Sequence, residues 1–86
     1  MCAEYMTKVK LSAAGSVDVG IPTNGGILGV YSNTAVKLDW VFNGEVGQIA
    51  PAGSLVWEPH NPFCPGPFSA LRITSTAAAE ITIRMV

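Results

Sequence analysis

The sequence predicts an all-β protein: a compact antiparallel β-sandwich or jelly-roll-like small barrel of seven to eight short strands, in a single domain over residues 1–86. Two observations carry this prediction. Several segments alternate apolar and polar residues with a period of two, whereas no window of helical length repeats apolar residues at intervals of three and four. Nine Gly and six Pro interrupt the chain, so turn-forming sites separate short segments, as they do in small sandwiches.

The N-terminal part of the chain contains three expected strands. Residues 6–11 form the first, and its Lys8 and Lys10 share one face, which is typical of an edge strand or a solvent-facing side. Residues 16–20 form a second short strand and residues 27–31 a third. The uncharged segment 21–31 is therefore expected to offer a packing surface between subunits.

The clearest alternation in the sequence covers residues 36–42, after the turn-forming sequence Ser32-Asn33-Thr34. One face of this expected strand carries Val36, Leu38, Trp40 and Phe42. The strand runs directly into Asn43-Gly44, the dipeptide that most readily adopts the positive φ angles of a two-residue hairpin. A chain reversal is predicted there.

Four further strands are expected in the second half of the chain. Residues 46–49 and 54–57 are separated by the turn Pro51-Ala52-Gly53. Residues 70–75 and 80–86 alternate in the same way and are joined by a segment short enough for an antiparallel hairpin. That hairpin would bring Arg72 or Arg84 beside Glu80 or Thr82 on its outer face.

The composition points to a surface that is covered by a partner. Hydrophobic residues make up 49% of the 86 residues and charged residues only 13%, whereas ordinary soluble domains carry about 25% charged residues. A chain of this length also buries only about 60–65% of its unfolded surface. We therefore expect a homo-oligomer.

The charge pattern argues against two classes of partner. Five basic residues against six acidic ones give a net charge of −1, which provides no electrostatic footprint for nucleic acid or for an anionic membrane surface. Neither partner is expected, and no uncharged stretch has the continuity of a membrane span. The N-terminus lacks the pattern of a secretory signal, so Cys2 and Cys64 are expected to be free thiols in a reducing compartment.

The most informative stretch is the loop over residues 58–68, which contains four prolines and is therefore stiff. Phe63 and Phe68 add apolar area to this loop, and Trp57 directly precedes it. Two interpretations stay open: these three aromatic residues form an exposed patch that meets a partner, or the loop folds back and plugs the end of the sandwich with Phe63 and Phe68. One aromatic residue can serve each role.

The same loop contains His60 and Asn61, the remaining candidate binding residues, together with Cys64. One His and one nearby Cys are too few ligands for a zinc site, and no acidic orienter or oxyanion hole accompanies a Cys–His pair. We therefore expect no cofactor, no metal and no enzymatic activity. His60 is interpreted as a hydrogen-bonded loop residue or an interface contact, and Cys64 as a small buried apolar residue.

The pattern of turns and strands resembles that of a known group of proteins. The residues that carry the resemblance are the turn Ile49-Ala50-Pro51-Ala52-Gly53, the aromatic and proline-rich loop, and the alternating segments Leu71-Arg72-Ile73-Thr74-Ser75 and Glu80-Ile81-Thr82-Ile83-Arg84. The chain is similar in these respects to the small β-sandwich accessory proteins of tailed bacteriophage virions, of the capsid decoration or cementing type.

This resemblance implies a non-enzymatic structural protein that decorates or cements an assembled bacteriophage capsid. It implies a homo-oligomer, with a trimer favoured, and the major capsid protein or another virion protein as partner. The protein would be made in the host cytoplasm and located in the virion. Two alternatives stay open: a small tail, collar or fibre-base component, and a carbohydrate-binding module in which Trp57, His60 and Asn61 form a sugar platform.

Overall fold

The computed structural model describes residues 4–21 and 25–86, and its regular structure consists of β-strands. There are six strands in this part of the chain: β1 (Tyr5–Leu11), β2 (Gly15–Gly20), β3 (Ile27–Phe42), β4 (Glu45–Trp57), β5 (Ala70–Ser75) and β6 (Ala79–Met85). The predicted all-β fold is confirmed. The strand number of seven to eight is slightly too high.

The difference arises at two expected turns, which bend strands instead of reversing the chain. Ser32-Asn33-Thr34 lies within the 16-residue strand β3, and Pro51-Ala52-Gly53 lies within the 13-residue strand β4. Both bends occur where the pairing of β3 with β4 shifts register, so bulges absorb the extra residues and the ladder continues beyond them. Gly53, with a φ of 98°, supplies a backbone conformation that other residues rarely adopt.

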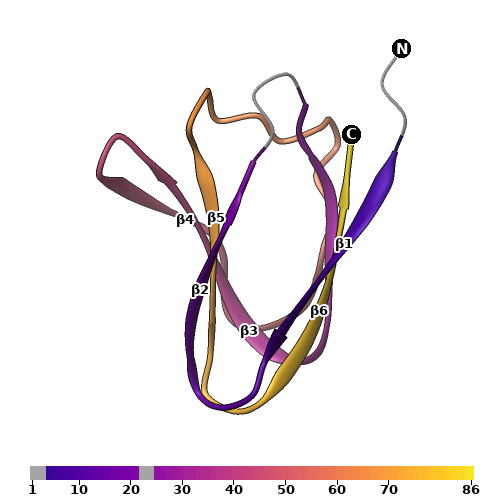
Figure 1. Ribbon diagram of the computed structural model, residues 1–86, viewed down its shortest axis with the longest axis vertical. Coiled ribbons are helices and arrows are strands. Elements are labelled where there is room, and N and C mark those ends of the chain that lie inside the picture. Colours follow the sequence, from indigo (N-terminus) through magenta and orange to yellow (C-terminus); the bar gives the residue numbers. More distant parts are fainter. Residues whose placement is uncertain (1–3, 22–24) are drawn as a thin grey trace.

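The strands form one antiparallel sheet in the order β1-β6-β3-β5-β2, with β4 on the other edge of β3. β5 pairs with residues 36–41 of β3, and β6 pairs with the earlier part of β3, between residues 27 and 32. β5 and β6 thus lie end to end along β3, and β2 and β1 lie end to end along them. Figure 1 shows the result, a sheet that curls into a U with two facing arms.

The hairpin predicted between residues 70–75 and 80–86 is wrong, although both segments are strands. β5 and β6 do not pair with each other, because β3 occupies one edge of both and the N-terminal strands occupy the other. The arginines consequently find different partners from those expected. Arg72 contacts Asp18 at 2.8 Å, and Arg84 contacts Glu4 at 3.3 Å.

The hairpin predicted at Asn43-Gly44 is confirmed. Both residues have positive φ angles, 51° and 78°, and Phe42 pairs directly with Glu45 across the turn. The expected edge position of Lys8 and Lys10 is also confirmed, since β1 pairs with β6 alone among the described strands and both lysines are exposed.

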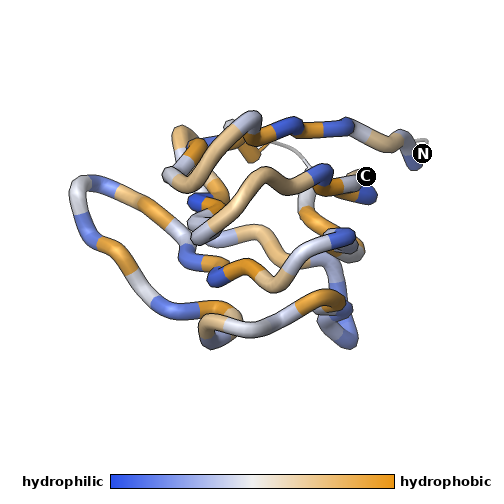
Figure 2. The backbone as a smooth tube through the Cα atoms, turned by 90° about the horizontal axis from the view of Figure 1, so that it is seen from below, coloured by the Kyte–Doolittle hydropathy of each residue, from blue (hydrophilic) through white to orange (hydrophobic). Residues whose placement is uncertain are grey.

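The core lies between the two arms of the U. Alternation of hydrophobic and hydrophilic residues along the strands, visible in Figure 2, directs one face of each arm inward. The buried apolar residues come from both arms: Ile21, Ile27, Val30, Val36, Leu38, Ala50, Leu71, Ile73, Ala79, Ile81, Ile83 and Met85.

The segment expected to pack between subunits therefore contributes to the core of the chain itself. Ile21, Ile27 and Val30 are at most 5% exposed. Their side chains cannot form a surface between subunits while the fold is intact. Residues 22–24 of that segment lie outside the described part of the chain.

Candidate interaction surface

The loop over residues 58–69 connects β4 to β5 and crosses the open end of the U (Figure 1). Backbone hydrogen bonds fasten it to the sheet at two points. The Ile27 amide donates to the Phe63 carbonyl at 3.1 Å and the Phe63 amide donates to the Ile27 carbonyl at 2.9 Å, while the Ile21 amide donates to the Ser69 carbonyl at 3.0 Å. The loop is thus held at its middle and at its end.

Phe63 closes the end of the core. Its side chain and that of Trp57 are partly buried and pack against the core residues. The two rings meet edge to face, with centroids 5.5 Å apart and planes at 86°, a favourable aromatic geometry. Of the two interpretations of the loop, the plug describes Phe63. Trp57, which was expected in the exposed patch, packs against Phe63 and the core instead.

Phe68 has the opposite environment. Its side chain is 93% exposed, the highest value among the large apolar residues described. Its φ of 60° places a bulky residue in the left-handed region, which costs about 1–2 kcal/mol. Pro67 fixes the preceding φ, and the Ser69 hydroxyl donates to the Gly66 carbonyl at 2.6 Å. Phe68 is thus displayed on a braced turn.

His60 and Asn61 lie at a bend of the same loop, and both are exposed. Their expected role as contact residues stays a prediction. Together with Phe68 they place exposed polar and aromatic groups on one loop, while Trp57 and Phe63 anchor that loop to the core.

Cys64 differs from its expected environment, because it is exposed and not buried. Its thiol is free and donates to the Gly25 carbonyl at 2.8 Å. The preceding residue, Phe63, packs against the core and is extended where it bridges Ile27. Successive side chains of an extended segment face opposite sides, so the Cys64 thiol stays at the surface. The expectation for Cys2 lies outside the described residues.

Glu58 has its hydrogen-bond partner on β3. It accepts a hydrogen bond of 2.7 Å from the Tyr31 hydroxyl, and this bond to the carboxylate raises the pKa of Tyr31 above its usual value of 10.0. Among residues 4–21 and 25–86, no group of three or more His, Cys, Asp or Glu side chains is arranged to hold a metal ion.

Sequence reasoning missed the polar network around Tyr31. Arg84 Nη1 lies 3.5 Å from the Tyr31 hydroxyl, and Arg84 Nη2 forms an ion pair with Glu4. These residues come from the N-terminal segment, β3, β6 and the loop, and only the strand order brings them together. No local pattern could have revealed the network.

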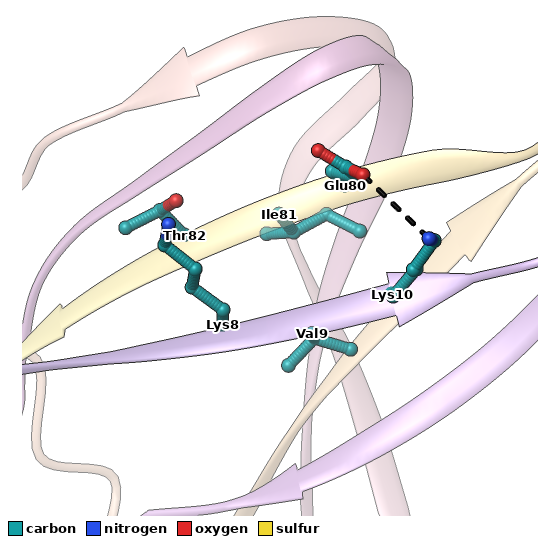
Figure 3. Close-up of a pocket in the computed structure, with 6 residues that line it drawn as sticks. All are labelled: Lys8, Val9, Lys10, Glu80, Ile81 and Thr82. Atoms are coloured by element: carbon teal, nitrogen blue, oxygen red, sulfur yellow. Dashed lines mark ion pairs between the residues drawn. The ribbon is translucent and has the colours of Figure 1, made fainter.

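A shallow groove runs between β1 and β6 (Figure 3). Its lining contains Lys8, Lys10, Glu80 and Thr82 together with Val9 and Ile81, and a 3.9 Å ion pair joins Lys10 to Glu80. None of the four polar side chains is buried, so the groove lacks the fixed polar group that usually orients a bound molecule. The lysines belong to a solvated edge.

Comparison with known proteins adds a likeness in structure. A solved chain, described as "Solution NMR structure of a de novo designed double-stranded beta-helix", matches with a TM-score of 0.52 and 15% sequence identity, covering 95% of this chain and 99% of that one. The likeness concerns the fold alone. It agrees with the curled sheet described above. No protein-family model and no curated protein matches the sequence.

None of the described segments forms a helix with the length and hydropathy that a membrane-spanning helix requires.

Proposed function

We propose that this chain is a non-enzymatic virion structural protein that decorates or cements an assembled bacteriophage capsid. The observation that carries the proposal is the display of Phe68, 93% exposed on a braced turn. The proposed partner is the major capsid protein or another virion protein, and the protein acts in the virion as a homo-oligomer, with a trimer favoured.

The physical reason begins with the cost of displaying this side chain. A left-handed conformation at a bulky residue is unfavourable, and an exposed phenyl ring gains nothing from burial in the isolated chain. Both costs are offset when the ring enters an apolar pocket of a partner, because burial of an aromatic side chain stabilises a complex by about 1.5–3 kcal/mol. A braced turn also loses little entropy on binding.

The residues of the loop have different roles in the proposed contact. Trp57 and Phe63 fix the loop on the core, Phe68 forms the apolar centre of the contact, and the exposed His60 and Asn61 form its polar rim. An apolar centre with a polar rim is the common arrangement of protein interfaces. Many identical weak contacts on one shell add up to firm attachment, so each copy can be small.

The test is co-sedimentation of the purified protein with assembled bacteriophage capsids and, separately, with isolated tails. We expect binding to capsids, and we expect Phe68→Ala to weaken it by at least about tenfold, the equivalent of about 1.4 kcal/mol. Met6→Ala is the matched control, because Met6 is 66% exposed on β1 and lies outside the loop.

Three results would overturn the proposal: absence of binding by the parent protein, unchanged binding by Phe68→Ala, or an equal loss in Met6→Ala. Binding to tails and not to capsids would favour a tail, collar or fibre-base component. Binding of a monomer to a glycan array, lost in His60→Ala or Asn61→Ala, would favour the carbohydrate-binding module.

A further inference from the structure

The outer edge of β4 is a second surface without a partner. β4 pairs with β3 alone among the described strands, so the backbone groups on its other side are unpaired. It also carries three exposed apolar side chains, Val46, Leu55 and Val56, which are 52%, 51% and 58% exposed. A long exposed edge with apolar side chains is a template for pairing with another strand.

Hairpin geometry determines which groups face outward near the start of β4. Phe42 and Glu45 flank the two-residue turn and form its first hydrogen-bonded pair, and the next pair of this kind is Trp40 with Gly47. The alternate residues on β4, Val46 and Gln48, therefore direct their N–H and C=O groups away from β3. This part of the hairpin projects from the sheet at the left of Figure 1.

The two halves of β4 differ in how well their edges are protected. Pairing is regular over residues 45–48, whereas register shifts interrupt it between Tyr31 and Asp39 of β3. The second half also leads into the charged Glu58. Bulges and charges protect edges. The first shift after the turn falls at Ile49, so residues 45–48 form the less protected part of the edge.

Charge separates this edge from the one on the opposite side of the sheet. Two copies pairing through β1 would bring the exposed Lys8 and Lys10 of each copy together, and like charges opposite one another are destabilising. Residues 45–50 contain a single charge, Glu45, at one end. The β4 edge is thus electrostatically compatible with a copy of itself, whereas the β1 edge is not.

We propose that two copies of this chain pair through residues 45–49 of β4, antiparallel about a two-fold axis at Gly47. Val46 of each copy then faces Gln48 of the other, and each such pair exchanges two backbone hydrogen bonds. Glu45 faces Ile49 of the second copy. The two Glu45 residues lie about 13 Å apart along the strands, beyond the screening length of about 8 Å at physiological salt.

The size of this contact sets its strength. Five residues of paired strand extend about 17 Å, so the buried area stays below the roughly 1,000 Å² of a firm specific complex. The contact is therefore weak, and the fraction of paired chains rises with protein concentration. It needs no capsid, so it goes beyond the proposed function and is tested separately from it.

The experiment is sedimentation velocity of the purified protein at rising concentrations, with Val46→Lys as the test and Val56→Lys as the matched control. Both valines are exposed on β4 to a similar degree. We expect the parent and Val56→Lys to form species with an even number of chains, and Val46→Lys to raise the dissociation constant at least about tenfold. Circular dichroism checks that both variants fold.

Hydrogen exchange of the parent protein gives a second measurement that needs no substitution. The amides of Val46 and Gln48 are expected to exchange more slowly as concentration rises, while the amide of Lys8 on the opposite edge is expected to stay unchanged. The proposal is overturned by a parent protein that stays monomeric or trimeric at all concentrations, by a greater effect of Val56→Lys, or by exchange at Val46 and Gln48 that does not depend on concentration.

Discussion

Gly47→Ala is the sharpest test of how the β3–β4 hairpin is packed. Gly47 pairs with Trp40, and a Cβ atom at Gly47 would overlap the indole ring, which lies directly over this glycine. The backbone of Gly47 is outside the left-handed region, so alanine fits its conformation. The three atoms nearest to the added Cβ all belong to the ring of Trp40.

The expected loss of stability follows from two opposing effects. If the ring stays in place, inserting a methyl group against it costs about 1–3 kcal/mol. If the ring moves away instead, the lost burial of the indole costs a similar amount, because a fully covered tryptophan buries about 150–250 Å² at about 25 cal/mol per Å² and this one is only partly covered. Alanine in a strand is favoured over glycine by about 0.5–1 kcal/mol. The net expectation is a decrease of about 1–2 kcal/mol in the free energy of unfolding.

Urea unfolding followed by circular dichroism measures this difference. In a Trp57→Phe background Trp40 is the one remaining tryptophan, so the fluorescence reports on it directly. Its emission is expected to shift to longer wavelength in Gly47→Ala. Gly20→Ala is the control, because a Cβ at Gly20 meets no atom within 4 Å. Equal or greater stability of Gly47→Ala than of Gly20→Ala would refute the packing described.

Two further predictions concern the loop and the outer face of the sheet. Phe63→Ala is expected to lower the free energy of unfolding by about 2 kcal/mol. This is less than the 3–5 kcal/mol lost at a fully buried Phe, because the Phe63 ring is only partly buried against Trp57. Urea unfolding measures the difference, and a free energy of unfolding within about 0.5 kcal/mol of the parent's would contradict the role of Phe63 as a plug. A hydrogen bond from Arg72 lowers the pKa of Asp18 below its usual 3.8, so this pair stabilises the fold above that pH and its contribution is lost as pH falls through the lowered value. Asp18→Asn is therefore expected to flatten the dependence of the urea midpoint on acid pH, and an unchanged slope would contradict that contribution.

The local features of the fold could be predicted from the sequence because short-range physics determines them. Each of the six strands contains at least one segment that was predicted as a strand, and the positive φ angles of Asn43 and Gly44 follow from their residue types. The continuity of β3 could not be predicted in this way. Ser32-Asn33-Thr34 does make local turn contacts, since the Thr34 amide donates to the Ser32 hydroxyl at 3.2 Å, yet neighbouring strands hold the chain in the ladder on both sides.

The candidate surface was predictable in part for the same reason. The proline-rich sequence identified the loop, but Phe63 and Phe68 have similar local sequences, with a proline beside each. Their different fates depend on distant partners: Phe63 meets Ile27 at the rim of the sheet, whereas the turn at Phe68 directs its ring to solvent. Sequence alone gives no information about such a partner.

The end-to-end arrangement of the strands has a consequence for synthesis on the ribosome. The β3–β4 hairpin can form as soon as its own residues emerge, because its two strands adjoin in the chain. β1 and β2 have to wait, since their partners are β6 and β5. Their apolar faces stay uncovered during that interval, which makes the nascent chain open to misassociation. Ordering of the first strands is therefore among the last events in the maturation of this protein.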